Sequence, residues 1–177
     1  MVRRLLLLVL VILLAGAALP AAREDLEGAG DVTRGRIVEA VDGDTVKVLD
    51  SEGRRVTVRL VGIDTPETKR PGVGVECGGP QASALMAELA RPGREVTLRT
   101  DPTQDTFDRY DRLLAYAVVE GRSLQTRMLA AGWATTYVYD DEPFQRYDRF
   151  RAAEREARDA RRGVHGLCGG DFHSESR

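Results

Sequence analysis

Two acidic side chains stand at alternate positions just before a predicted strand, in the segment Val41-Asp42-Gly43-Asp44-Thr45. Asp-Gly is a common turn dipeptide, so a plain turn explains this segment when it is taken alone. A calcium loop of the helix-loop-helix type would start at Asp42 and need glutamate at its twelfth position, where Gly53 stands. A chemical role for Asp42 and Asp44 therefore depends on what lies near them in space.

A second cluster, Arg59 to Glu67 (RLVGIDTPE), lies one predicted hairpin farther along the chain. If its strand pairs with the preceding one, Arg59 lies opposite Thr45 and beside Asp44. Asp64 is about 17 Å farther along a straight strand, so it reaches Asp44 only if the sheet curls, as in a barrel. With that curl, Asp44 and Asp64 form a pocket of oxygen ligands for a divalent cation, with a guanidinium nearby and Glu67 at its rim.

A third cluster, Asp108-Arg109-Tyr110-Asp111-Arg112, precedes another predicted strand and adds two guanidinium groups and a tyrosine. Phosphodiester hydrolysis requires this combination of arginines, a cation pocket and a further carboxylate. Its phosphorane-like transition state carries more negative charge than the ground state, and arginine donors and a cation stabilise that charge. The further carboxylate can orient or deprotonate the attacking water.

Three motifs in this order and spacing resemble the thermonuclease family of secreted, staphylococcal-nuclease-like enzymes. They are Val41–Val48 (VDGDTVKV), Arg59–Glu67 (RLVGIDTPE) and Asp108–Tyr116 (DRYDRLLAY), and the resemblance extends from about Gly35 to Gly163. It implies a five-stranded oligonucleotide/oligosaccharide-binding (OB-fold) barrel with three helices. It also implies calcium-dependent hydrolysis of DNA and RNA with little sequence preference, in which the bond to the 5′ oxygen breaks and 3′-phosphate ends remain.

The resemblance implies a metal-binding role for four of the matching residues. Asp44 and Asp64 would ligate Ca²⁺ through their carboxylates, and Thr65 through its backbone carbonyl. Asp42 would not contact the cation itself but would orient the residues that do.

The remaining roles that the resemblance implies concern the substrate. Arg59 and Arg112 would hold the scissile phosphate, and Glu67 would act on the water as base or orienter. Tyr110 and Tyr137 would contact the nucleotide in the same pocket.

Other polar residues are expected to have no role in chemistry. A solvated acidic loop is the interpretation of the aspartates Asp101, Asp105, Asp108 and Asp111. Asp111 also stands where the family usually has glycine, and aspartate tolerates the left-handed backbone region better than most residues. His165 and His173 occur in a glycine-rich tail without metal-ligand spacing, which favours surface histidines.

Alternating and helical patterns of apolar residues predict the elements that position these motifs. Val56, Val58 and Leu60 share one strand face, whereas Arg59 projects from the other. Five strands with a helix between the third and fourth, then two more helices, favour a mainly β, α+β fold with a small closed barrel. The predicted strands are Gly35–Val41, Thr45–Leu49, Arg54–Ile63, Glu95–Thr100 and Leu113–Val119, and the predicted helices are Pro80–Ala90, Ser123–Gly132 and Pro143–Arg162.

The N-terminal residues 1–22 have the basic, apolar and small-residue regions of a secretory signal peptide. An uncleaved anchor is the alternative, although the apolar run is short for a membrane helix of roughly 20 residues. The predicted organisation continues with a linker (residues 23–34), a nuclease domain (35–167) and a polar tail (168–177). This organisation predicts a secreted or extracytoplasmic protein, with membrane contact only through an uncleaved N-terminal segment.

The chain has two cysteines, Cys77 and Cys168. Export would place them where disulfides persist, and a bridge between them would close a loop of about 90 residues and stabilise the fold by about 4 to 5 kcal/mol. Two free buried cysteines are the alternative.

The composition is that of a soluble globular protein, with 42% hydrophobic and 31% charged residues. The formal net charge of −2 does not by itself favour nucleic acid as a partner. A competing hypothesis is a non-catalytic OB-fold module that binds single-stranded nucleic acid. Such a module would be basic and would lose metal ligands or the catalytic carboxylate, so we expect a monomeric nuclease with Ca²⁺, DNA and RNA as partners and no stable protein partner.

Overall fold

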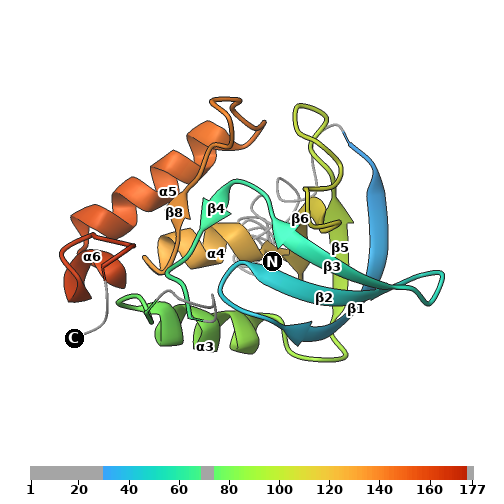
Figure 1. Cartoon of the computed structure of the whole chain (residues 1–177), viewed down its shortest axis with the longest axis horizontal. Coiled ribbons are helices and arrows are strands. Elements are labelled where there is room, and N and C mark those ends of the chain that lie inside the picture. Colours follow the sequence, from blue (N-terminus) through green and yellow to red (C-terminus); the bar gives the residue numbers. More distant parts are fainter. Residues whose placement is uncertain (1–29, 69–73, 175–177) are drawn as a thin grey trace, which may run out of the picture.

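The structure, a computed structural model, describes residues 30–68 and 74–174 (Figure 1). The predicted signal segment lies outside these residues. Strand β1 (Val32–Ala40) begins three residues before Gly35, so the end of the predicted linker belongs to a strand. No helix in the described ranges is long and apolar enough to cross a membrane.

A closed barrel dominates one side of the molecule (Figure 1). Strands β1, β2 (Thr45–Asp50), β3 (Arg55–Leu60), β5 (Glu95–Arg99) and β6 (Leu113–Val119) are ordered β3-β2-β1-β5-β6. The parallel pairing of β3 with β6 closes this sheet on itself. The predicted five-stranded barrel is therefore confirmed, and β7 (Arg122–Ser123) extends it beside β6.

The alternation of strand β3 sets its two faces. Val58 and Leu60 are fully buried in the barrel core, and Arg59 between them points to the opposite side.

The strand predicted over Arg54–Ile63 is in fact two strands. β3 ends at Leu60, and β4 (Ile63–Asp64) pairs instead with β8 (Thr135–Thr136) outside the barrel. Gly62 makes the break, because its φ of +81° suits glycine and a Cβ there would lie 2.6 Å from the Phe144 ring. Asp64 is thus redirected by a turn rather than by strand curvature alone.

Helices α3 (Gly79–Leu89), α4 (Leu124–Ala130) and α5 (Tyr147–Asp159) are the three predicted helices, and α6 (Val164–Leu167) adds a short fourth. Ser123 caps α4, as predicted, by accepting a hydrogen bond from the Thr126 backbone N–H at 3.2 Å. Helix α4 packs against α3, β6 and α5, so it lies between the barrel and the C-terminal helices (Figure 1).

The acidic-loop interpretation of Asp101 is wrong. Its side chain is buried and accepts hydrogen bonds from the Tyr116 hydroxyl and from the Gln145 backbone N–H. Burial acts to raise the pKa of Asp101, but these hydrogen bonds outweigh it and hold the pKa below its usual value. Helix α5 begins at Tyr147 rather than near Pro143, where the sequence predicted its start.

Residues 168–174 of the predicted polar tail are held against the rest of the domain. Cys77 and Cys168 form the predicted disulfide, with their Cα atoms 6.1 Å apart. Phe172 is buried, and His165, predicted to be a surface histidine, is buried in ring contact with it at 5.3 Å between ring centroids.

Candidate active site

The loop between β1 and β2 presents two carboxylates at one edge of the barrel. Asp42 Oδ1 accepts a hydrogen bond from the Asp44 backbone N–H at 3.1 Å. Gly43 lies directly against Thr65, because a Cβ at this glycine would stand 2.5 Å from the Thr65 Oγ1. The Asp-Gly turn and the acidic site are therefore one structure, in which the turn directs Asp44 inward to 8% exposure.

Arg59 joins the two predicted metal-binding carboxylates. It lies opposite the first residue of β2, as predicted. Its Nη2 is 3.1 Å from Asp44 Oδ2 and 3.1 Å from Asp64 Oδ1. Its Nη1 donates hydrogen bonds to the carbonyls of Leu60 and Ile63 at 2.9 and 2.7 Å, and the side chain is only 14% exposed.

The turn at Gly62 brings Asp64 and Thr65 to this guanidinium. The Gly62 carbonyl accepts a hydrogen bond from the Tyr137 N–H at 3.0 Å, which fixes the turn to the segment after β8. The Thr65 hydroxyl then donates to Asp44 Oδ2 at 3.3 Å. The change of chain direction at Gly62 thus brings Asp64 to Arg59, whereas a straight strand would hold the two residues far apart.

Burial and mutual repulsion act on the carboxylates of the site. Burial raises the pKa of Asp42, and the charge of Asp44 raises it further, to about 6. Burial also raises the pKa of Asp64; the Arg59 charge opposes this shift and the Asp44 charge adds to it. Three carboxylates around one guanidinium leave an excess of negative charge that a bound cation would neutralise.

The donor set fits a hard cation that accepts mixed oxygen ligands. Asp44 and Asp64 offer carboxylate oxygens around one guanidinium nitrogen, and Thr65 contacts Asp44. Within residues 30–68 and 74–174, no three His, Cys, Asp or Glu side chains form a metal-binding group. Other ligands would therefore be carbonyl oxygens or water, which hard cations such as Ca²⁺ and Mg²⁺ accept.

Glu67 lies in the loop after β4, half-buried, with its backbone clamped. Its N–H donates to Glu76 Oε2 at 2.6 Å, and its carbonyl accepts from the Glu76 N–H at 2.9 Å. Its own side-chain Oε1 accepts from the Thr68 N–H at 2.8 Å. Glu76 therefore holds the main chain from which the predicted water-activating carboxylate projects.

Arg112 lies two residues before Leu114, the β6 residue that pairs with Arg59. Its Nε and Nη2 donate to Asp108 Oδ2 at 2.7 and 2.6 Å. Burial acts to raise the pKa of Asp108, but the Arg112 hydrogen bonds outweigh it and lower the pKa. Asp108 is therefore a structural partner of Arg112 rather than part of a solvated acidic loop. Asp111 adopts the left-handed region with φ 59°, the conformation expected where the family has glycine.

The two predicted substrate-binding tyrosines are exposed on the surface. Tyr110 is 64% exposed, and the guanidinium groups of Arg109 and Arg112 lie 4.8 and 5.3 Å from its ring centroid. Tyr137 is 45% exposed and is held beside the Gly62 turn. Both rings are available for contact with a ligand.

Two further residues at the site were not predicted from the sequence. Glu76 holds the Glu67 backbone, and His173 reaches the site from the C-terminal segment. Glu76 stands directly before Cys77, so the predicted disulfide was the available signal that this region meets the chain near Cys168. No local pattern pointed to His173.

Comparison with known proteins gives the family of the chain. The family described as "Staphylococcal nuclease homologue" matches residues 57–165. Endonuclease YncB of Bacillus subtilis is 45% identical over 121 residues, covering 67% of this chain and 55% of that protein. The SPbeta prophage-derived endonuclease YokF of the same organism is 45% identical over 130 residues, covering 72% of this chain and 41% of that protein.

A thermonuclease of Staphylococcus hyicus is 28% identical over 130 residues, covering 73% of each chain. The aligned region spans about half the length of the two Bacillus proteins. The family match covers more than half of this chain and contains Arg59, Asp64, Glu67 and Arg112. The chain belongs to the staphylococcal nuclease family.

Proposed function

We propose that this protein is an exported, calcium-dependent nuclease that hydrolyses phosphodiester bonds of DNA and RNA with little sequence specificity. The observation that carries the proposal is the buried contact of Arg59 with both Asp44 and Asp64 beside Glu67's clamped loop. This arrangement combines a cation-binding pair, a phosphate-binding guanidinium and a carboxylate for water.

Asp44, Asp64 and the Thr65 carbonyl would hold Ca²⁺, with Asp42 orienting Asp44 through the hydrogen bond to its N–H. When bound, Ca²⁺ supplies positive charge that polarises the phosphoryl group. Ca²⁺ would compete with Arg59 for the carboxylates of Asp44 and Asp64. Arg59 would then be available to donate to a phosphoryl oxygen.

The chemistry assigned to the side chains is a displacement at phosphorus. Glu67 accepts a proton from water, the water oxygen forms a bond to phosphorus, and the bond from phosphorus to the 5′ oxygen breaks. The 5′ oxygen leaves as a hydroxyl after taking a proton from solvent, and the phosphate stays on the 3′ side. Arg59 and Arg112 donate to the equatorial oxygens, whose charge increases in the transition state.

The surface features favour a substrate with accessible bases. Tyr110 and Tyr137 are exposed aromatic rings. Stacking of a base on such a ring needs neither a hydrogen bond to one defined base edge nor a recognition helix. Stacking on aromatic rings tolerates every base, which supports low sequence preference. Export is supported by the Cys77–Cys168 disulfide, because such bonds persist in oxidising compartments.

The test is incubation of the purified protein with end-labelled single-stranded DNA and RNA in millimolar calcium, in magnesium and in chelator. We expect degradation of both polymers in calcium, less in magnesium and none in chelator. Glu67→Gln serves as the matched inactive variant. Binding of intact polymer without cleavage in calcium would replace the proposal with the non-catalytic binding module.

A further inference from the structure

The segment after α6 has a defined position relative to the site. The Cys77–Cys168 disulfide attaches its beginning to the start of α3, and the Cys77 N–H donates to the Ser174 carbonyl at 2.7 Å near its end. Between these points Phe172 is buried against His165. The segment is therefore anchored at both ends and in the middle.

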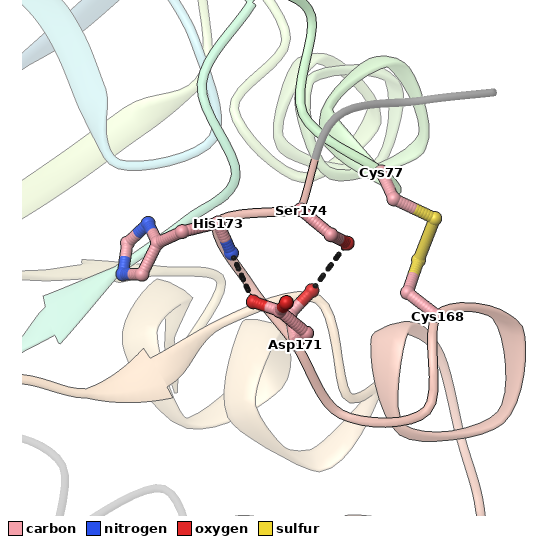
Figure 2. The surroundings of a disulfide bond; sticks show 5 residues. All are labelled: Cys77, Cys168, Asp171, His173 and Ser174. Carbon is pink, nitrogen blue, oxygen red and sulfur yellow. Dashed lines mark hydrogen bonds between the residues drawn. A yellow bond between two sulfur atoms is a disulfide. The ribbon is translucent and has the colours of Figure 1, made fainter.

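A tight turn within this segment directs one side chain away from the disulfide. Asp171 Oδ1 accepts from the His173 N–H at 3.0 Å, and the Asp171 carbonyl accepts from the Ser174 hydroxyl at 3.1 Å (Figure 2). Figure 2 shows the imidazole of His173 on the side of the turn opposite to Cys77 and Cys168. The anchors and the turn together set the direction of this imidazole.

The imidazole of His173 lies against two carboxylates of the candidate site. Its Nδ1 is 3.4 Å from Glu76 Oε1, and its Nε2 is 4.0 Å from Asp64 Oδ2. The other oxygen of Glu76 accepts the Glu67 N–H at 2.6 Å. A continuous series of contacts thus connects the C-terminal segment to the backbone of Glu67.

We propose that this disulfide-anchored segment is part of the active site and that His173 is a positioning residue, which holds Glu76 in the orientation that fixes the Glu67 backbone. The proposal rests on the nuclease function proposed above. Glu76 is buried at 8% exposure, whereas the His173 side chain is 66% exposed. Because solvent screens a pair with one largely exposed partner, this contact contributes little to stability, so loss of His173 should alter the position of Glu67 rather than the fold.

The first experiment measures activity of the full chain in saturating calcium. We expect His173→Ala to lower kcat about tenfold, as removal of groups that orient a site's ligands does, with KM for single-stranded DNA unchanged within about twofold. His173→Gln keeps a hydrogen-bond donor that can reach Glu76, and it should restore most of kcat. Leu167→Ala, an exposed substitution at the end of α6 directly before this segment, is the matched control and should behave as wild type.

The second experiment needs neither calcium nor substrate. Hydrogen exchange of the Glu67 amide, followed by NMR in chelator, reports directly on its bond to Glu76. We expect exchange to accelerate about tenfold in His173→Ala and in a Cys77→Ser/Cys168→Ser double variant, and to stay at the wild-type rate in Leu167→Ala. Circular dichroism confirms that each variant is folded before exchange is interpreted.

The outcomes separate the two proposals. If oxidised wild-type protein does not cleave nucleic acid, the nuclease proposal fails, and the exchange measurement alone decides the role of His173. If wild type cleaves but His173→Ala keeps full kcat and a protected Glu67 amide, the positioning role is refuted. A loss of kcat that His173→Gln does not recover would also refute it, because the polar contact of residue 173 with Glu76 would not be the cause.

Discussion

Replacement of Arg59 by methionine would remove the guanidinium that contacts both Asp44 and Asp64. The side chain makes two ion pairs at 3.1 Å and donates to two backbone carbonyls while only 14% exposed. Removing one partner of a buried ion pair costs about 3 to 5 kcal/mol, because the remaining charge stays buried without compensation. Asp64 keeps 28% exposure, so we expect the free energy of unfolding in chelator to fall by about 3 kcal/mol, the lower end of that range.

Calcium should reduce this loss. Arg59 and a bound cation neutralise the same carboxylates, so by linkage removal of Arg59 should tighten calcium binding, by about tenfold or more. A ligand at 100 times its Kd stabilises the folded state by about 2.7 kcal/mol, and a tenfold lower Kd adds about 1.4 kcal/mol. Turnover should still fall by at least ~10², because the transition-state charge loses its arginine donor.

Urea denaturation in chelator and in calcium, with calcium titration calorimetry, measures both effects. Arg55→Met is the matched control, because Arg55 lies on the same strand four residues earlier and is exposed. It should leave stability and calcium affinity near wild type. A loss below about 1 kcal/mol in chelator, or weaker calcium binding in Arg59→Met, would refute the reasoning that Arg59 compensates a buried acidic pair.

Three further changes test separate parts of the structure. Glu67→Gln should slow single-turnover cleavage by about 10² to 10⁴ while calorimetry shows unchanged calcium affinity, since the carboxylate acts on water; a collapse of calcium binding would make Glu67 a metal ligand. Gly43→Ala should weaken calcium binding measured by titration, because its Cβ would stand 2.5 Å from the Thr65 Oγ1 and displace that residue from Asp44. For Glu154, burial acts to raise the pKa, but hydrogen bonds from Thr136 and the Arg151 charge outweigh it and lower the pKa. The stabilisation from Glu154 is therefore present above the unfolded pKa of about 4.3 and lost as pH falls through the lower folded value. Glu154→Gln should reduce the loss of stability at acidic pH that urea denaturation measures. An unchanged dependence of stability on pH would contradict this.

Local patterns predicted the barrel and the pairing within it. The strand Leu113–Val119 has the predicted bounds, and Arg59 lies opposite Thr45 as expected from the hairpin. Both features depend on alternation and on a short turn, which are encoded within a few residues. The hairpin and an assumed curl of the sheet also brought Arg59, Asp44 and Asp64 together, and the resemblance to the nuclease family then indicated their roles.

Features that depend on tertiary contacts were not predicted. The break in the third predicted strand at Gly62 reflects a close approach by the Phe144 ring, which is distant in sequence. Asp101 was interpreted as solvated because its neighbours are polar, yet Tyr116 and Gln145 bury it. The contact of His173 with Glu76 depends on a disulfide that brings together residues 91 apart. In each case the determining partner lies far outside any local window.

The acidic balance of the chain becomes compatible with a polyanionic substrate when the pairing of its arginines is considered. In the structure Arg59 is held by Asp44 and Asp64, and Arg112 is held by Asp108, so carboxylates already occupy both guanidinium groups. A phosphate must compete with these carboxylates, so we expect affinity for nucleic acid to be low despite the arginines. A cation bound at Asp44 and Asp64 would take over part of their charge and free Arg59 for the phosphate. The order of events that this geometry favours is therefore cation first and substrate second, with positive charge exposed at the site only when the groups for hydrolysis are assembled.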